Sequence, residues 1–314
     1  MGYIFGPVSS SRLGRSLGID LIPRKVCSFD CVYCECGPTL GRLIDQRHPF
    51  VDIRELMREL DLYFLEAPLH FDTITITGCG EPTLELHLGR ILTELHKRTS
   101  IPIAVLTNAS LIDREDVQSD LAQADRVLPS LDAVDQELFQ KIDRPHPEVS
   151  VSKIIDGMTK FRCRFPDVQF WLEVMMVRGF NNSREHLVEL KKVVRRINPH
   201  RLDVVTVTRP PAYENVEAVS DVELVEIKKF LWGKGENASP EKLHEVSSFM
   251  NEQRILETLY RRPCTFLELL HMCQWNEREL REKLDLWIVQ GKVKSLCYQG
   301  RRFFQDMGKI NYGV

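Results

Sequence analysis

Strand and helix patterns alternate along residues 18–232, and this alternation constrains the fold of the 314-residue chain more than any other feature. Apolar and β-branched runs that favour strands are each followed by a segment whose apolar residues recur at helical spacing. The predicted strands cover 18–22, 71–77, 101–107, 126–131, 168–177 and 201–208, and the predicted helices cover 52–65, 84–98, 114–122, 151–165, 184–197 and 221–232. This order predicts an α/β fold with a parallel sheet and helices outside it. Six units with right-handed crossovers predict an open, partial (β/α)6 barrel, since a closed barrel of this kind has eight.

The pattern changes near residue 235. Residues 233–240 are rich in Gly, Asn, Ser and Pro, which predicts a linker. Three helix patterns at 252–261, 265–273 and 276–288 follow, and then a hairpin that turns at Gln299-Gly300. Three helices and a hairpin resemble a winged-helix module. We therefore predict a barrel domain over 1–235, a linker over 236–246 and a small winged-helix-like domain over 247–314.

Three cysteines follow the first predicted strand with the spacing C-x3-C-x2-C, at Cys27, Cys31 and Cys34. A loop this tight can turn three sulfurs onto one inorganic centre. Three thiolates suit a four-iron cluster with one iron left without a protein ligand. Structural zinc is the alternative, but it usually takes four ligands in two separated pairs, and no second pair stands at that spacing. Three unrelated core cysteines are the remaining interpretation, which the polar, turn-rich setting disfavours.

The cysteine motif, with Tyr33 directly before its last cysteine, resembles the signature of radical S-adenosylmethionine (SAM) enzymes. Residues 5–20 resemble one branch, the Fe–S oxidoreductases related to wybutosine-synthesis enzymes of the 4-demethylwyosine synthase type. The resemblance covers roughly the first three quarters of the chain. It implies a six-unit partial barrel, a [4Fe–4S] cluster on Cys27, Cys31 and Cys34, and S-adenosyl-L-methionine on the open iron. It further implies reductive cleavage of that cofactor, hydrogen abstraction from a substrate, and an electron donor of the flavodoxin or ferredoxin type.

The second predicted strand runs into Gly78-Cys79-Gly80-Glu81. The resemblance implies that this segment stands where the family has a Gly-Gly-Glu-like motif, whose exposed backbone contacts the ammonium group of the cofactor. Glycines permit a close approach of backbone to ligand. Because Cys79 and Gly80 depart from the family pattern, we expect Gly78 and Gly80 to matter more than any one side chain, with Glu81 as a further contact. A plain strand-to-helix turn is the alternative.

Polar residues also end the next two strands and interrupt the cysteine loop. Asn108 and Ser130 are expected to bond the ribose or carboxylate of the cofactor, and Asp132 the cofactor or the substrate. In a barrel such strand ends face one mouth, so these groups should converge. Tyr33 is expected to lie against the adenine or the cluster. A turn residue for Asn108, local caps for Ser130 and Asp132, and a core aromatic for Tyr33 are the alternatives.

Several charged residues lie near the predicted mouth. Glu173 interrupts an apolar strand, and since a buried unpaired carboxylate is costly, we expect it to face the barrel lumen. Arg178 and Arg209 follow the last two strands and could bind an anion or lie in solvent. Four cations flank the cysteine loop and could hold an anion or a phosphate backbone, or form surface ion pairs: Arg12, Arg15, Arg24 and Lys25.

The six other cysteines lack cluster spacing. Cys36 could be a fourth ligand or a reactive thiol, but a radical mechanism needs the fourth iron open, so we expect neither. Cys79 could be a redox or hydrogen-donor thiol, or a small buried residue. The others are expected to pack in the interior: Cys163, Cys264, Cys273 and Cys297.

Composition narrows the class of protein. The net charge of −3 requires no nucleic acid or anionic membrane as partner. No apolar run of about 18 residues predicts a membrane span, and the first residues do not resemble a signal peptide, so we expect a cytoplasmic protein. The C-terminal helix pattern carries Arg278, Arg281 and Lys283 among acidic residues, which is compatible with protein docking or with nucleic acid.

The resulting hypothesis is a radical SAM enzyme whose substrate is an RNA base, a metabolite or a protein. Enzymes of the resembling branch carry further cysteines ahead of the main motif for a second cluster, whereas the first cysteine here is Cys27, so the substrate stays open. An iron–sulfur redox sensor or regulator with a winged-helix interaction domain is the alternative, although a regulator needs no cavity lined by strand ends. A zinc-stabilised binding protein is the third.

Overall fold

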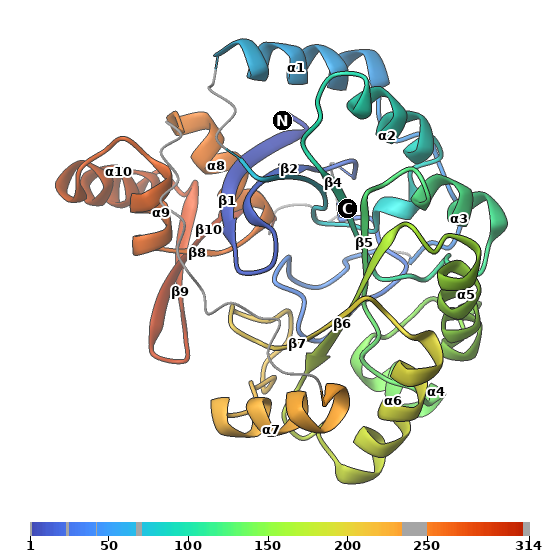
Figure 1. Cartoon of the computed structure of the whole chain (residues 1–314). Coiled ribbons are helices and arrows are strands. Elements are labelled where there is room, and N and C mark those ends of the chain that lie inside the picture. Colours follow the sequence, from blue (N-terminus) through green and yellow to red (C-terminus); the bar gives the residue numbers. More distant parts are fainter. Residues whose placement is uncertain (1, 23–24, 42, 67–70, 234–249, 310–314) are drawn as a thin grey trace.

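A curled seven-stranded sheet forms the core of the computed structural model, which describes residues 2–22, 25–41, 43–66, 71–233 and 250–309 (Figure 1). The strands are β1 (Ile4–Ser10), β2 (Gly14–Ile19), β3 (Thr73–Ile76), β4 (Ile103–Thr107), β5 (Arg126–Pro129), β6 (Gln169–Met176) and β7 (Arg201–Thr206). Their spatial order equals their chain order. Strands β2 to β7 are parallel, and β1 is antiparallel to β2. The α/β class and the partial barrel predicted from the sequence are confirmed.

Helices cover the outer face of this sheet, with two after β5 and one after each other parallel strand (Figure 1). They are α1 (Ile53–Glu66), α2 (Leu88–His96), α3 (Glu115–Leu121), α4 (Gln136–Ile142), α5 (Val151–Arg164), α6 (Arg184–Ile197) and α7 (Asp221–Trp232). Ser183 and Ser220 cap α6 and α7, since each hydroxyl accepts a hydrogen bond from a first-turn amide. These two helices have the bounds that the sequence predicts. In the described part of the chain no helix is long and apolar enough to cross a bilayer.

Three parts of the barrel differ from the sequence prediction. The first unit begins with a hairpin, β1 and β2, where a single strand over 18–22 was predicted, and α4 was not predicted at all. The predicted helix over 84–98 is a short 3-10 turn, η1 (Pro82–Leu84), followed by α2. The hairpin is rich in Gly and Ser, which have weak strand preference, so cross-strand pairing forms it. The predicted linker over 236–246 lies outside the described residues.

One face of the sheet looks into the lumen of the half-barrel. Along β6, buried residues that pack under the helices alternate with half-buried residues that face inward, namely Trp171, Glu173 and Met175. Leu13, in the turn of the β1–β2 hairpin, packs against Ala104 and Leu128 of β4 and β5. The hairpin turn therefore fills part of the lumen at the amino ends of the strands.

Residues 250–309 form the smaller C-terminal part. Its elements are α8 (Glu252–Arg261), β8 (Cys264–Thr265), α9 (Phe266–Met272), α10 (Glu277–Val289), β9 (Val293–Tyr298), β10 (Arg301–Asp306) and η2 (Met307–Lys309). Thr265 and Asn276 start α9 and α10 with capping boxes. The three antiparallel strands have the order β8-β10-β9. The predicted helices and hairpin are thus present, while the winged-helix assignment stays a prediction.

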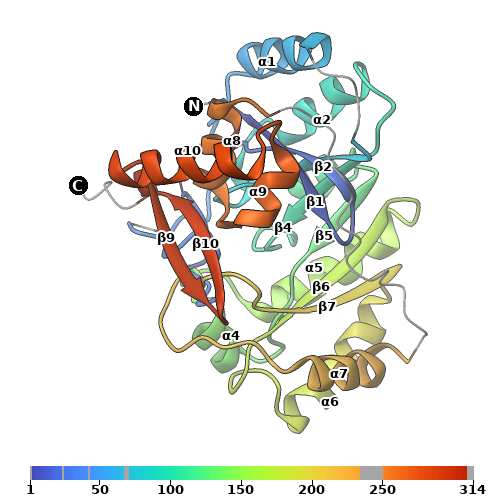
Figure 2. The same cartoon turned by 90° about the vertical axis from the view of Figure 1, so that its left-hand side faces the viewer.

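The C-terminal part spans the gap between the two edge strands of the sheet (Figures 1 and 2). At one edge, α8 and α9 pack against β1. Beyond the other edge, Tyr298 donates to the carbonyl of Val216 at 3.2 Å and Gln299 donates to that of Val207 at 3.4 Å. The open side of the half-barrel is therefore covered by residues that follow it in the chain.

Candidate active site at the carboxyl ends of the strands

The cysteine loop follows β2 and is held by backbone hydrogen bonds to two other parts of the barrel, the end of α4 and the segment after β3. Val32 N donates to the carbonyl of Ile142 at 2.9 Å, and Asp30 N donates to that of Asp143 at 3.0 Å. Glu81 N, after β3, donates to the Val26 carbonyl at 3.2 Å. The loop is therefore part of the rigid mouth at the carboxyl ends of the strands, where parallel α/β folds place their chemistry.

Polar groups surround the three thiols. Asn108 Nδ2 and the Phe29 amide lie 3.5 and 3.4 Å from Cys27 Sγ, and Lys25 Nζ lies 3.4 Å from Cys34 Sγ. Burial, with the Glu81 carboxylate, raises the pKa of Cys27 to about 12. Burial also raises the pKa of Cys31. These two thiols are protonated at neutral pH, so a metal that binds them must displace their protons.

This donor set fits a four-iron cluster better than a single metal ion. The cysteines influence one another electrostatically, and each has nitrogen donors or a carboxyl group at its sulfur. Within the described ranges, no three Cys, His, Asp or Glu side chains converge tightly enough to hold one ion, as zinc requires. A four-iron cluster places each thiolate on a different iron and needs no such convergence. Hydrogen-bond donors near the sulfurs also suit it, because they tune its potential.

Tyr33 of the cysteine loop and Asp132, which lies after β5, meet inside the mouth. The Tyr33 hydroxyl donates to Asp132 Oδ2, and Asp132 Oδ1 accepts from the Met175 amide at 2.7 Å. Burial raises the pKa of Asp132 to about 6. Asp143 lies 3.5 Å from both the Tyr33 hydroxyl and Cys31 Sγ. Tyr33 therefore links two buried carboxyl groups, those of Asp132 and Asp143, to the cysteine loop.

The sequence analysis missed Asp143, although it contacts the cluster motif more directly than Asp132 does. Burial, and next the neighbouring Asp132, raise the pKa of Asp143 well above its usual value. Asp143 follows α4, the helix that was not predicted. No spacing or strand end marks it, and only the fold brings it to the loop.

Glu81 is buried, and its carboxylate accepts hydrogen bonds from residues at the carboxyl ends of β3 and β4. Oε1 accepts from the hydroxyls of Thr83 and Thr107, each at 2.6 Å, and Oε2 accepts from the Asn108 amide at 2.7 Å. The carboxylate thus ties η1 to the end of β4. Glu81 therefore has a structural role, and its direct contact with a cofactor stays a prediction.

The two glycines of this segment stand where side chains have no room. A Cβ on Gly78 would lie 2.0 Å from Asp20 Oδ1, and a Cβ on Gly80 would lie 2.2 Å from the Val26 carbonyl. Close packing therefore requires glycine at both positions, whatever the cofactor adds.

Asn108 Nδ2 also donates to Ser28 Oγ at 3.2 Å, and half-buried Ser130 continues β5 through a backbone bridge to Glu173.

The sequence analysis misplaced two of the cations said to flank the cysteine loop. Arg12 and Arg15 belong to the β1–β2 hairpin at the amino ends of the strands, where Arg12 pairs with Glu173 and Arg15 with Asp72. The whole of β2 separates them from the cysteines. Lys25 is at the loop, and Arg24 lies outside the described residues.

Arg209 and Arg178 have carboxylate partners. Arg209 follows β7 and links the cysteine loop to the C-terminal part: its Nε lies 3.1 Å from Glu35, and its Nη atoms donate to Glu268 and to the Pro263 carbonyl. An anion site at Arg209 is therefore not supported. Arg178 is exposed and lies 3.5 Å from Glu217.

The cysteines outside the triad have different environments. The thiol of Cys36 donates to Cys79 Sγ at 3.2 Å and to the Arg261 carbonyl at 3.1 Å, and both thiols are buried. Cys264 is buried, as expected for a packing residue. Cys163 and Cys297 are exposed, so the expectation that they pack in the interior is wrong. Both lie at positions that the helical or strand pattern turns toward solvent.

Comparisons with known proteins agree with this arrangement. Residues 21–191, more than half of the chain, match the model of the radical SAM superfamily. A UPF0026 protein of Methanocaldococcus jannaschii is 30% identical over 97% of this chain and 96% of its own length. A protein of Brachyspira hyodysenteriae named GTPase Obg is 34% identical over 95% of this chain, which spans 44% of that protein.

Solved structures show the same fold at low identity. TYW1 with a lysine-pyruvate adduct has a TM-score of 0.53 and 15% identity, over 72% of this chain and 75% of that one. SuiB of Streptococcus suis bound to S-adenosylmethionine has a TM-score of 0.50 and 18% identity, over 68% of this chain and 46% of that one. The resemblance inferred from the cysteine motif is confirmed. This chain belongs to the radical SAM superfamily, as an enzyme whose cofactors are a [4Fe–4S] cluster and S-adenosyl-L-methionine.

Proposed function

We propose that Cys27, Cys31 and Cys34 ligate three irons of the cluster, and that S-adenosylmethionine binds the fourth beside Gly78–Glu81. The observation that supports this assignment is the clamping of the cysteine loop by the segments after β3 and α4. A loop held on both sides keeps its thiols in place before the metal arrives, which reduces the ordering cost of binding. Asn108 and Lys25 are the nearest side-chain nitrogen donors to the ligand sulfurs.

When bound and reduced, the cluster supplies the electron that cleaves S-adenosylmethionine into methionine and the 5'-deoxyadenosyl radical that abstracts a substrate hydrogen. The protein positions the reactants and keeps water away from the radical. Tyr33, fixed by Asp132, offers an aromatic face next to Cys34, and Asn108 and Ser130 offer polar groups to the cofactor. Asp132 holds or releases a proton near neutral pH, because its pKa is about 6.

The partners follow from this chemistry. A reductant of the flavodoxin or ferredoxin type supplies the electron, and a substrate supplies the hydrogen. On α10 the cations are already paired, Arg278 with Glu282 at 2.8 Å and Arg281 with Glu277 at 2.6 Å, while Leu286 and Val289 are exposed. We therefore assign the winged-helix-like part to contact with protein rather than with nucleic acid.

Anaerobic reconstitution with iron and sulfide tests the assignment. We expect about four irons per chain, and cleavage of S-adenosylmethionine to 5'-deoxyadenosine and methionine under dithionite. Cys31→Ser should lose both, and Cys163→Ser, on the exposed face of α5, should lose neither. A stable cluster with no cleavage would point to the regulator, and bound zinc without iron would point to the binding protein; either result contradicts the proposal.

The substrate class is an RNA base, a metabolite or a protein side chain, and isotope transfer separates the three. Cells are grown in deuterated medium, and their RNA, small-molecule and protein fractions are incubated anaerobically with the loaded enzyme. The fraction that holds the substrate transfers deuterium into 5'-deoxyadenosine. Transfer from RNA supports RNA modification, whereas transfer from one of the other fractions alone rules it out.

A further inference from the structure

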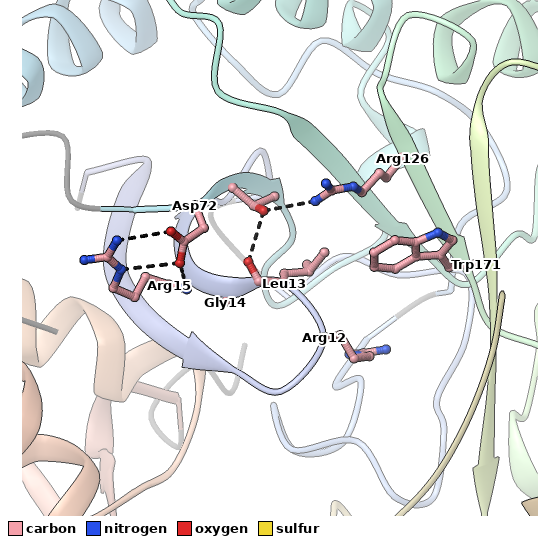
Figure 3. A pocket seen from close by; sticks show the side chains of 8 residues that line it. Arg12, Leu13, Gly14, Arg15, Asp72, Arg126 and Trp171 are labelled. Atoms are coloured by element: carbon pink, nitrogen blue, oxygen red, sulfur yellow. Dashed lines mark hydrogen bonds and ion pairs between the residues drawn. The ribbon is translucent and has the colours of Figure 1, made fainter. Parts of the chain in front are cut away.

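The amino ends of the strands carry a pocket that the proposed cofactor site does not use (Figure 3). Its volume is about 530 Å³, within the range of small-ligand sites. The lining residues are Arg12, Leu13, Gly14, Arg15, Asp72, Thr73, Arg126 and Trp171. They begin β2, β3 and β5 or lie near the start of β6, so this pocket and the cysteine loop are at opposite ends of the parallel strands.

Three of the four arginines gathered at this end are neutralised by a carboxylate. Arg12 pairs with Glu173 across the lumen. Arg15 Nη2 and Nε lie 3.1 and 3.3 Å from the two carboxylate oxygens of Asp72. Arg201 donates from Nε and Nη2 to Asp203 Oδ1 at 2.8 and 2.7 Å. Such paired arginines have little charge left for a ligand.

Arg126 differs from the other three. Its Nη1 donates to the hydroxyl of Thr73 at 3.2 Å, and its guanidinium stacks on Trp171 at 5.1 Å from the ring centroid. Across the residues that the structure describes, no carboxylate lies within ion-pair distance of Arg126. A half-buried cation loses hydration, and a cation–π contact offsets only part of that loss.

The stack that holds Arg126 contains a second cation. Trp171 also receives the guanidinium of Arg201, whose carbon lies 4.6 Å from the ring centroid, and Arg201 is in turn fixed by Asp203. The order Arg201, Trp171, Arg126 follows the side-by-side strands β7, β6 and β5. The contacts of Arg126 engage its Nη1 and one face of its guanidinium, so Nε and Nη2 of the planar fork are available for a ligand.

We infer that this pocket binds an oxyanion, a carboxylate or phosphate group of a small organic ligand, through Arg126. With Arg12 paired to Glu173 and Arg15 paired to Asp72, Arg126 leaves the lining with one positive charge in excess, which attracts an anion. A planar guanidinium matches either oxyanion with two parallel hydrogen bonds. The ligand is distinct from S-adenosylmethionine, whose proposed site is at the other end of the strands, so the inference goes beyond the proposed function.

Calorimetric titration of the anaerobic, cluster-loaded protein tests the inference, with inorganic phosphate in one series and malonate in the other. Chloride keeps the ionic strength constant. We expect saturable binding of at least one probe, weakened about tenfold to a hundredfold by Arg126→Gln because a charge-assisted hydrogen-bond pair is lost. Arg126→Lys should retain part of the affinity, and Arg178→Gln, at an exposed ion pair of the other mouth, should leave it unchanged.

The two probes separate the sources of the anion: preference for phosphate indicates a phosphorylated ligand, and preference for malonate a carboxylic acid. Thermal unfolding of Arg126→Gln should differ little from that of the unsubstituted protein, since the variant loses one hydrogen bond to Thr73 and one stacking contact with Trp171. No saturable binding of either probe, or equal affinity in Arg126→Gln, overturns the inference. Cleavage of S-adenosylmethionine should be unchanged in this variant, so failure here is distinguishable from failure of the proposed function.

Discussion

Arg261 Nε donates to Asp20 Oδ2 at 2.9 Å in an ion pair whose side chains are 2% and 1% exposed. Asp20 directly follows β2, and Arg261 is the last residue of α8. Arg261 also donates to the Gly2 carbonyl at 2.6 Å and lies over the ring of Phe5. One guanidinium therefore joins the C-terminal part to the first hairpin and to the segment that leads into the cysteine loop.

Arg261→Met should destabilise the protein strongly, because it leaves the Asp20 carboxylate buried without its cation. Removing one partner of a buried pair costs about 3–5 kcal/mol. Urea denaturation of the variant and of the unsubstituted protein measures the difference in their free energies of unfolding. The double variant Asp20→Asn with Arg261→Met should recover part of the loss, since no buried charge is then left alone. A loss below about 1 kcal/mol in Arg261→Met would show that the pair contributes no more than a surface ion pair.

The contact between Arg209 and Glu268 predicts acid sensitivity. Burial alone would raise the pKa of Glu268, but the hydrogen bond and charge of Arg209 outweigh it and hold this pKa at about 2, below the usual 4.5. A depressed carboxyl pKa stabilises the fold above the unfolded-state value and loses that contribution as pH falls from about 4.5 toward 2. The contribution is on the order of 3 kcal/mol.

Denaturant unfolding at pH 7, 5, 4 and 3 checks this for the unsubstituted protein and for Glu268→Gln. The difference in unfolding free energy between the two should be constant from pH 7 to 5 and should shrink below pH 4.5. Comparison of two variants cancels the titration of the other carboxyl groups. A difference that does not change with pH would mean that Glu268 stabilises through packing alone.

Substitution of Cys36 tests whether the triad is the complete ligand set. Cys36 donates to the Arg261 carbonyl and to Cys79, so Cys36→Ser should keep the iron content and the visible absorption of the loaded cluster. Cys34→Ser, two residues earlier, is the matched variant and should lose most of the iron. Loss of iron in Cys36→Ser would identify a fourth protein ligand and would contradict an open iron.

The closeness of Cys36 and Cys79 predicts a disulfide under oxidation. Their sulfurs are 3.2 Å apart, and a disulfide needs about 2 Å, which a small shift of both side chains supplies. Treatment of the loaded protein with diamide, which accepts the two hydrogens lost, should give a Cys36–Cys79 cross-linked peptide in mass spectrometry. Cys79→Ser should abolish it, while exposed Cys297 stays available to alkylation. A cross-link to Cys34 instead would contradict the prediction.

The sequence predicts the six strand–helix units well because each helix carries an apolar stripe and each parallel strand is an apolar run. It predicts the hairpin and α4 poorly, because their residues have weak local preference and depend on neighbouring strands. Arg12 and Arg15 show the same limit in the site. They are near the cysteines in the sequence. However, β2 runs from the end of the barrel where the arginines lie to the end where the cysteines lie. Asp143 shows the converse, since only tertiary packing brings it to Cys31.

The bridging of β1 and the end of β7 by residues 250–309 has a consequence for how such an enzyme diversifies. The strands and the loops after them bear the proposed cofactor contacts, while the wall on the remaining side belongs to a separate set of elements. Exchange of that wall would change the shape available to a substrate, provided that the replacement keeps a cation for the buried Asp20 carboxylate. The part of the chain that shapes the substrate site can therefore change in evolution separately from the part that holds the proposed cofactors.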